Sequence, residues 1–208
     1  MNNSFKIKRM VGIASLAAIA AVLQYVSQFI TFGPFNITLA LTPIVVGAIL
    51  YGPVGGSILG LIVGIVILVS GQAQAFLVIS PVGTIFTVLL KSTLAGLASG
   101  FVFLGLKKKN PLLGTVLASL IVPIVNTGIF ALSCMTVLYN ALLELANGAN
   151  TMYFLFISMI GINFLFEFAI NSLLSPALYQ IVKIFATKLH ISAYFNLKDN
   201  NEETSSDK

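Results

Sequence analysis

The sequence predicts an all-α membrane protein whose helices cross the bilayer six times. Hydrophobic residues make up 58% of the chain and charged residues only 8%, whereas a soluble domain carries about 25% charged residues. The mean hydropathy is +1.02. A helix needs about 20 apolar residues to cross a bilayer, and such stretches fill most of the 208 residues. No room remains for a soluble domain large enough to be an enzyme.

The first half of the chain predicts three spans. Residues 11–30 form the first, after a basic start, and the Gly-Pro pair at residues 33–34 ends it. A secretory signal also starts with basic residues, but this run is long enough to span and further spans follow it. Residues 37–51 predict a short second span, and a tight turn at residues 51–56 leads to a third that ends near Ser70.

The fourth span follows a mixed connection. Residues 71–81 are too polar, at Gln72 and Gln74, for a lipid-facing helix. The span itself covers residues 82–106 and stops where three lysines, an asparagine and a proline follow, because charge and proline both oppose continuation.

The remaining spans follow the same pattern. The fifth covers residues 112–139, residues 140–151 form an outside loop, and the last span covers residues 152–183. We therefore expect one transmembrane domain over residues 1–196 and a polar, disordered cytoplasmic tail over residues 197–208.

Charge placement predicts the orientation, because cytoplasmic loops carry an excess of Lys and Arg. The predicted outside loops contain neither residue, and their one charge is Glu144. With six spans, all basic clusters fall on one side, which places both termini in the cytoplasm; five or seven spans would put the C-terminal lysines outside. The clusters consist of Lys6, Lys8 and Arg9, of residues 107–109, and of Lys183, Lys188, Lys198 and Lys208.

Motifs for soluble chemistry are missing from the sequence. There is no Gly-rich phosphate loop ending in Lys-Ser/Thr, no HExxH and no pair of cysteines. The single Cys134 lies in an apolar run and predicts a small core residue, and His190 follows the last span. We therefore expect no catalytic residues, no metal site, no cofactor and no ATP site in this chain.

Lys91 in the fourth span and Glu167 in the sixth are the ionisable residues well inside hydrophobic segments. A charge at the centre of a membrane helix costs about 2.5–3.5 kcal/mol, so such residues face a bundle interior, a cavity or a partner. The sequence leaves two interpretations open: contact with a ligand or ion, and a structural pair between the two charges.

Other polar residues converge on the same region. Asn163, Glu167 and Asn171 repeat at i, i+4 and i+8 and form one stripe on the last helix, while Asn126 lies in the middle of the fifth. Hydrogen bonds between helices explain any one amide alone. Together with the patch around Lys91, they predict a polar pocket between helices four, five and six.

Small residues repeat with helical spacing and predict close approach of backbones. Gly56, Gly60 and Gly64 recur every four residues in the third span, and Gly96 and Gly100 do so in the fourth. In the first span, a flat strip that could dock another membrane subunit consists of Ala14, Ala17, Ala18 and Ala21.

The pattern resembles the substrate-binding S components of energy-coupling factor (ECF) vitamin transporters. The resemblance is carried by the basic start at residues 6–9, the alanine-rich residues 14–18, the turn within residues 48–56, and residues 91–100 with the lysines that follow them. It covers nearly the whole chain.

The resemblance implies a bundle that takes a micronutrient from outside in a pocket built by outer loops and the last three helices. It also implies association with a transmembrane T component and two cytosolic ATPases. In that family an AxxxA strip on the first helix contacts the T component, and either Ala14 with Ala18 or Ala17 with Ala21 would supply it here.

Pantothenate is the expected ligand, from a general likeness of residues 121–128 and from chemistry. Lys91 could neutralise a carboxylate. The absence of Trp argues against a large stacked flavin. Amide and hydroxyl groups of the ligand could meet Asn126, Asn163, Glu167 and Asn171.

The alternative hypothesis is a stand-alone secondary transporter that uses Lys91 and Glu167 as ion-coupling groups. The sequence shows no internal duplication between residues 1–104 and 105–208, a symmetry that many secondary transporters have. A third interpretation, an intramembrane enzyme or assembly factor, lacks a catalytic set.

Overall fold

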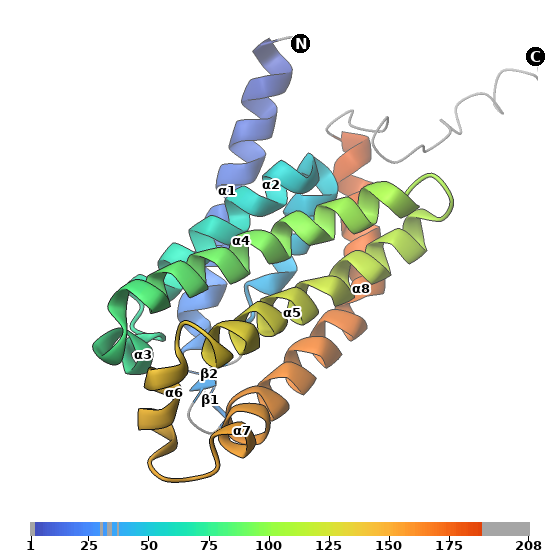
Figure 1. Ribbon diagram of the computed structural model, residues 1–208. Helices are drawn as coiled ribbons and strands as arrows, with labels where there is room; N and C mark the ends of the chain where they lie inside the picture. Colours follow the sequence, from blue (N-terminus) through green and yellow to red (C-terminus); the bar gives the residue numbers. More distant parts are fainter. Residues whose placement is uncertain (1–2, 30, 33–34, 37, 189–208) are drawn as a thin grey trace, which may run out of the picture.

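The computed structural model describes residues 3–29, 31–32, 35–36 and 38–188, which form a bundle of long helices with short elements gathered at one end (Figure 1). Within these residues, five helices are long and apolar enough to cross a membrane. The elements are α1 (Asn3–Ser27), β1 (Thr31–Phe32), β2 (Phe35–Asn36), α2 (Leu41–Val69), α3 (Gln74–Ile79), α4 (Pro81–Leu106), α5 (Pro111–Met135), α6 (Tyr139–Ala146), α7 (Thr151–Tyr153), the π-helix η1 (Phe154–Gly161) and α8 (Ile162–Lys188).

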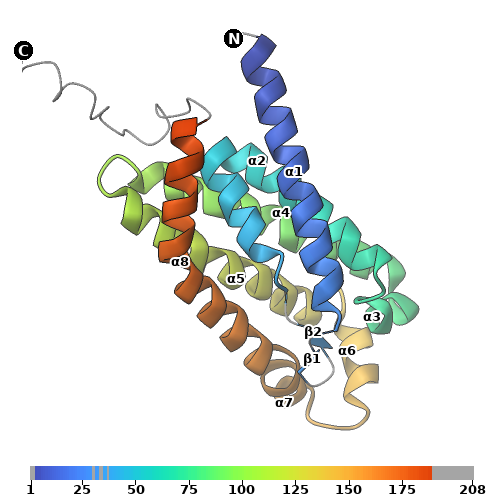
Figure 2. The same cartoon turned by 180° about the vertical axis from the view of Figure 1, so that it is seen from behind.

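Helix α2 folds back on itself at Gly52, whose φ of 79° lies in the left-handed region that favours glycine. Pro53 follows and restarts the helix. A Cβ built on Gly56 would lie 2.7 Å from the Cβ of Ala48, although a straight helix separates residues at i and i+8 by about 12 Å. The element therefore consists of two antiparallel arms, which Figure 2 shows meeting near α1.

The six predicted spans are not confirmed as six full-length helices. The two arms of α2 correspond to the second and third predicted spans, but the first arm, residues 41–51, is about 16 Å long. That is half of a hydrocarbon core of about 30 Å. One end of the bundle holds the start of α1, the last turns of α8 and the turn between α4 and α5 (Figures 1 and 2). That this end faces the cytoplasm stays a prediction.

Two segments predicted as connections contain helices instead. Helix α3 lies within residues 71–81, and α6 begins at Tyr139, the last residue of the predicted fifth span, and fills the first half of the predicted loop at residues 140–151. In α6, Ala141 and Leu142 are fully buried in a hydrophobic cluster that includes Cys134. The apolar side of this short segment makes it a helix, because folding against the bundle removes that side from solvent. The prediction that Cys134 is a core residue is confirmed.

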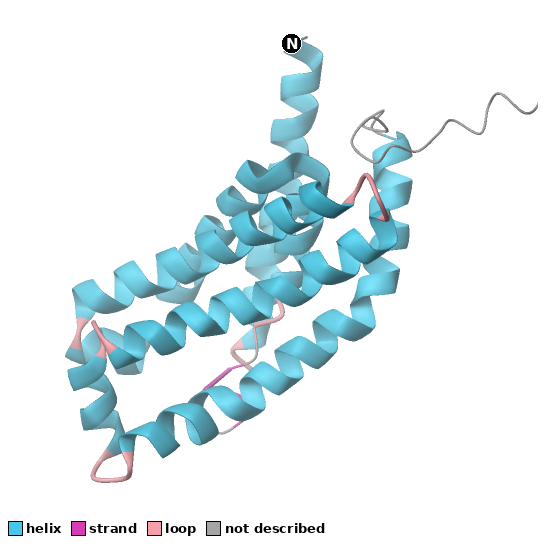
Figure 3. Cartoon of the chain, turned by 45° about the vertical axis from the view of Figure 1, so that its right-hand side comes forward, coloured by secondary structure: helices cyan, strands magenta, loops and turns pink. Residues whose placement is uncertain are grey.

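The short elements gather at the end of the bundle opposite the α4–α5 turn (Figure 3). The hairpin of β1 and β2 pairs Thr31 with Asn36 in antiparallel register. The last predicted span begins within α7 and continues through η1 into α8. These elements lie at the ends of α4, α5 and α8 that point away from that turn.

Glycines allow the second arm of α2 to pack tightly on α4. A Cβ on Gly56 would collide with the carbonyl oxygen of Gly96, and a Cβ on Gly96 would collide with that of Gly56. Gly60 lies in the same way against the carbonyl of Ser92. The predicted close approach of backbones is confirmed, and α4 is held between α2 and α5.

Candidate substrate-binding site

A cavity of about 110 Å³ lies among α4, α5, η1 and α8, closed by the segment before α2 and by the α2–α3 turn. Its apolar wall includes Phe76, Phe130, Met159 and Phe164. Its polar side chains come from most of the surrounding elements and consist of Thr38, Gln72, Thr84, Thr87, Lys91, Asn126, Thr127, Asn163 and Glu167.

Four of the five predicted binding residues line this cavity, namely Lys91, Asn126, Asn163 and Glu167. Asn171 does not line it, and its role in binding stays a prediction. It lies about 12 Å along the helix from Asn163, and its amide donates to the backbone carbonyl of Glu167 at 2.8 Å. The i, i+4, i+8 stripe is longer than the cavity that it faces.

Lys91 projects from α4 into the cavity, where it is the one basic side chain among the described lining residues. Its Nζ lies 5.2 Å from the centroid of the Phe130 ring. An ammonium group at this distance from an aromatic face gains a cation–π attraction. The ring of Phe130 therefore supports the cation while leaving it able to meet an anion.

Glu167 faces the same cavity from α8 and is 6% exposed. Its carboxylate accepts a hydrogen bond from the backbone N–H of Thr38 at 2.9 Å. The direct contacts that the structure describes for the two charges are therefore with Phe130 and Thr38. Opposite charges that share a cavity of low dielectric still attract each other.

Two acceptors in the lining lack a hydrogen-bond partner among the described residues: Oγ1 of Thr87 and Oδ1 of Asn163. Thr87 is 1% exposed and Asn163 is 9% exposed. An unsatisfied buried polar group costs about 1–3 kcal/mol, so each of these two oxygens is a point where a bound molecule or a water can supply a hydrogen bond. Two further unpartnered oxygens, on Gln24 and Asn171, lie outside the lining.

A hydrogen bond to the π-helix η1 orients the Asn163 amide. Its wider turn ends at Gly161, and the Asn163 side-chain nitrogen donates to the carbonyl of Met159 at 3.1 Å. This bond uses the nitrogen and leaves the amide oxygen as the free acceptor. π-Helical segments within α-helices are rare and are frequently found at functional sites.

The sequence prediction missed several lining residues. Thr84 and Thr87 precede Lys91 by seven and four positions, so helical spacing alone would have placed them on its face. Gln72 was noted as polar but not as a site residue. It exchanges two hydrogen bonds with Gln24: the Gln24 side-chain amide donates to Gln72 Oε1 at 2.6 Å, and the Gln72 amide donates to the Gln24 backbone carbonyl at 2.8 Å.

The predicted docking strip on α1 separates into exposed and buried residues. Ala14 and Ala18 are exposed. Ala17 is 8% exposed and packs in the core, and Ala21 is half-buried. Within the described residues, the face available to another subunit is therefore that of Ala14 and Ala18.

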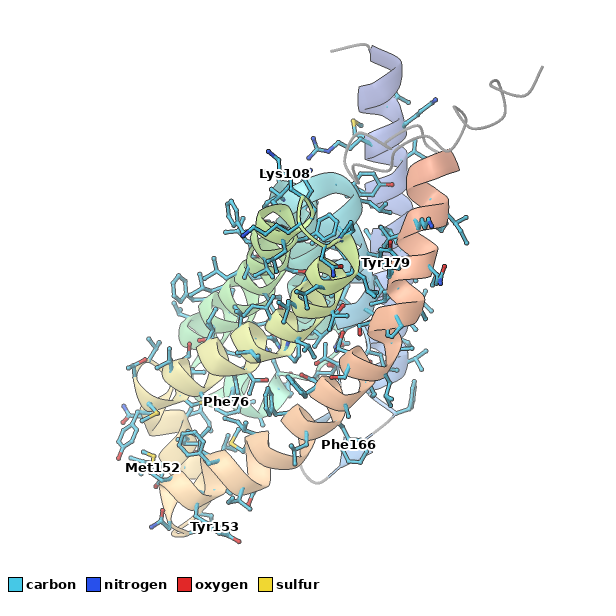
Figure 4. The ribbon with its side chains drawn as sticks, turned by 90° about the vertical axis from the view of Figure 1, so that its right-hand side faces the viewer. Phe76, Lys108, Met152, Tyr153, Phe166 and Tyr179 are labelled. Atoms are coloured by element: carbon cyan, nitrogen blue, oxygen red, sulfur yellow. The ribbon has the colours of Figure 1, made fainter. Side chains whose placement is uncertain are left out.

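Three aromatic residues, Phe35, Phe76 and Tyr153, belong to the end of the bundle opposite the α4–α5 turn, and the structure distinguishes between them. Phe76 is 4% exposed and lines the cavity. Tyr153 is 64% exposed and lies at the tip of the bundle, as Figure 4 shows, far from Lys108 at the opposite end. The side chain of Phe35 lies outside the described residues. Of the two described rings, Phe76 is thus the one that can contact a molecule in the cavity.

Comparison with known proteins identifies the family. A family model described as ECF transporter, substrate-specific component, matches residues 8–179, which include every residue that lines the cavity. A search of the curated proteins and a search of the solved structures each found no match.

The family defines the general role of the chain. Its members are multi-pass cell-membrane proteins that bind a small molecule for transport and are not enzymes. They work with a T component and ATPases, which supply the energy. With a match over most of its length and five helices long and apolar enough to cross a membrane among its described residues, this chain belongs to the family of substrate-specific components of ECF transporters.

Proposed function

We propose that the cavity binds pantothenate and that the chain delivers it to the T component and two ATPases for import. The observation that carries the proposal is the combination of one cation, Lys91, with two unpartnered buried acceptors, Thr87 and Asn163, in one small cavity. Pantothenate carries one carboxylate, two hydroxyls and an amide N–H, so it offers an anion and hydrogen-bond donors.

Each group of the vitamin has a complementary group in the lining. The carboxylate meets Lys91 in a charge-assisted contact. Its hydroxyl and amide donors meet Thr87 and Asn163, and Asn126, which is 4% exposed, offers an amide to its carbonyl oxygen. The dimethyl group of the vitamin packs on the apolar wall beside Phe76.

The size of the cavity supports a small ligand. Pockets for drug-sized molecules measure about 300–1,000 Å³, and this cavity of about 110 Å³ must widen even for a vitamin of fifteen heavy atoms. A flavin would need a far larger rearrangement. The hydrogen bond between Thr38 and Glu167 closes one side, so its opening is a direct way to admit the ligand.

The proposal includes an orientation. We place the start of α1, the last turns of α8 and the α4–α5 turn in the cytoplasm, because the lysines and the arginine that flank them favour that side. The cavity then opens towards the outside, and the chain crosses the membrane six times when the two arms of α2 are counted separately. Ala14 and Ala18 dock the T component, since small side chains allow helices to approach closely.

Binding of an acid and of its neutral counterpart tests the proposal. Lys91→Met should weaken the binding of pantothenate about 10- to 100-fold, the value of a hydrogen bond to a charged group. The same variant should bind pantothenol, which has an alcohol in place of the carboxylate, as the wild type does. Lys108→Met, in the exposed α4–α5 turn, is the matched control. Equal losses for both ligands would show that Lys91 acts as a structural partner of Glu167.

A further inference from the structure

A second hollow lies far from the substrate cavity, along the flank of α1. This groove has a volume of about 350 Å³ and runs between α1, the first arm of α2 and Phe185 near the end of α8. Its wall is almost wholly apolar. The α1 side includes Val11, Leu16 and Ile19, and the α2 side includes Val46 and Leu50.

The groove has the length of one bilayer leaflet. Its lining on α1 extends from Ile7 to Ile19, which is about 18 Å along a helix. One leaflet contributes about 15 Å of hydrocarbon to the bilayer core. Neighbouring side chains of α1 are apolar and exposed, with Met10 72% and Val22 63% exposed. The residues beside the groove are therefore apolar and exposed, as on a helix face that meets lipid.

Positive charge lies at one end of the groove. Lys8 is exposed and lines it. The Arg9 guanidinium donates to the backbone carbonyl of Tyr51 at 3.0 Å, and Tyr51 is itself a lining residue. None of the described lining residues is acidic. Figure 2 shows this part of α1 rising past the turn of α2, at the end of the bundle that carries the α4–α5 turn.

From this arrangement we propose that the groove holds one acyl chain of an anionic phospholipid, with its headgroup phosphate against Lys8 and Arg9. The apolar wall takes the chain along the depth of the leaflet, and the two cations select a negatively charged headgroup over a zwitterionic one. One basic side chain near a membrane surface contributes about a fivefold preference for an anionic lipid. The site is independent of the substrate cavity.

Lipid retention by the purified chain tests this proposal. The protein is exchanged into bilayers of equal phosphatidylglycerol and phosphatidylcholine with matched chains, and retained lipid is read by native mass spectrometry. Wild type should retain one phosphatidylglycerol in preference to phosphatidylcholine. Lys8→Gln should reduce that preference about fivefold, while Lys108→Gln, an exposed lysine of the α4–α5 turn at the same end, should leave it unchanged.

A second variant tests the groove itself. Ser15 is exposed at its edge, and its hydroxyl bonds to the backbone of its own helix, so Ser15→Phe fills the groove without disturbing the core. It should lower retention of both lipids, with an unchanged melting temperature.

Several results would overturn the proposal. They are equal retention of the two lipids by the wild type, an equal effect of the Lys8 and Lys108 changes, or full retention by Ser15→Phe. Release of the lipid by millimolar inorganic phosphate would show a simple anion site instead. If the groove seats a helix of a partner protein, the isolated chain will retain no lipid selectively.

Discussion

The carboxylate of Glu167 accepts a hydrogen bond from the backbone N–H of Thr38 at 2.9 Å, although 129 positions separate the two residues. The bond ties α8 to the segment that leads into α2. Both residues line the cavity, so one contact joins the wall of the site to the segment that closes it. The stability of the bundle and access to the site therefore depend on the same carboxylate.

Replacement of Glu167 tests this link. Glu167→Ala leaves the N–H of Thr38 without its acceptor, which costs about 1–3 kcal/mol, and leaves the Lys91 charge without its counter-charge. We expect a lower melting temperature in detergent and weaker vitamin binding. Glu167→Gln retains an acceptor oxygen and should lose less stability. Glu144→Ala, at an exposed position, is the control; a melting temperature for Glu167→Ala equal to that of the control would contradict the link.

Thr87 should show opposite effects on stability and on binding. Its Oγ1 is buried without a partner, so Thr87→Val removes an unsatisfied group and should stabilise the free protein by about 1 kcal/mol. The same change should weaken ligand binding, because it removes an acceptor for the ligand. Thermal unfolding with and without ligand measures both effects.

Thr115 supplies the matched control for that experiment. It is fully buried in α5, and its hydroxyl donates to the carbonyl of Pro111 at 2.9 Å. Thr115→Val should lower stability slightly and leave binding unchanged. If Thr87→Val destabilises the free protein as Thr115→Val does, the hydroxyl of Thr87 forms a hydrogen bond within the free protein, which contradicts its assignment as an unpartnered ligand contact.

The contact between α2 and α4 predicts a contrast between two glycines of α4. Gly96→Ala drives a methyl group into the Gly56 carbonyl and should cost about 1–3 kcal/mol or more. A Cβ at Gly105 meets nothing within 4 Å, so Gly105→Ala should be neutral or stabilise the helix by up to about 1 kcal/mol. Denaturation of the two variants in the same detergent compares them, and equal stabilities would show that the helices do not pack at Gly96.

Ala14 and Ala18 predict a loss of transport without a loss of binding. Ala14→Leu or Ala18→Leu adds bulk on an exposed face, so melting and vitamin binding should stay unchanged while ATP-driven uptake in the assembled transporter is abolished. Ala20 is fully buried, and Ala20→Leu should instead lower stability. Loss of vitamin binding in Ala14→Leu would argue against a docking role.

Helical spacing predicted which polar side chains share a face, because residues three or four positions apart lie on the same side of a helix. Asn163 and Glu167 are one turn apart and face the same cavity. Asn171 follows the same spacing but is not among the lining residues, since the number of turns that a cavity spans depends on how neighbouring helices close it. The same spacing places Thr87, one turn from Lys91, on the face that lines the cavity, although the sequence analysis did not apply it there.

Other parts of the site depend on contacts that have no local signature. Thr38 takes part through its backbone N–H in an irregular segment, where any residue type offers the same donor. In the fold, the Gly52-Pro53 pair predicted the turn correctly, because few residues besides glycine adopt a φ of 79°. Helix α6, by contrast, forms by packing against distant segments of the bundle, which spacing along the chain does not encode.

Equilibrium binding of labelled pantothenate to the purified chain, without ATP or an ion gradient, tests the central claim most directly. We predict saturable binding of one molecule per chain, accompanied by a rise in melting temperature as ligand binds the folded state. Failure of pantothenate to bind, while a vitamin that lacks a carboxylate binds and stabilises the same preparation, would contradict the assignment of Lys91 as the anion-recognising group.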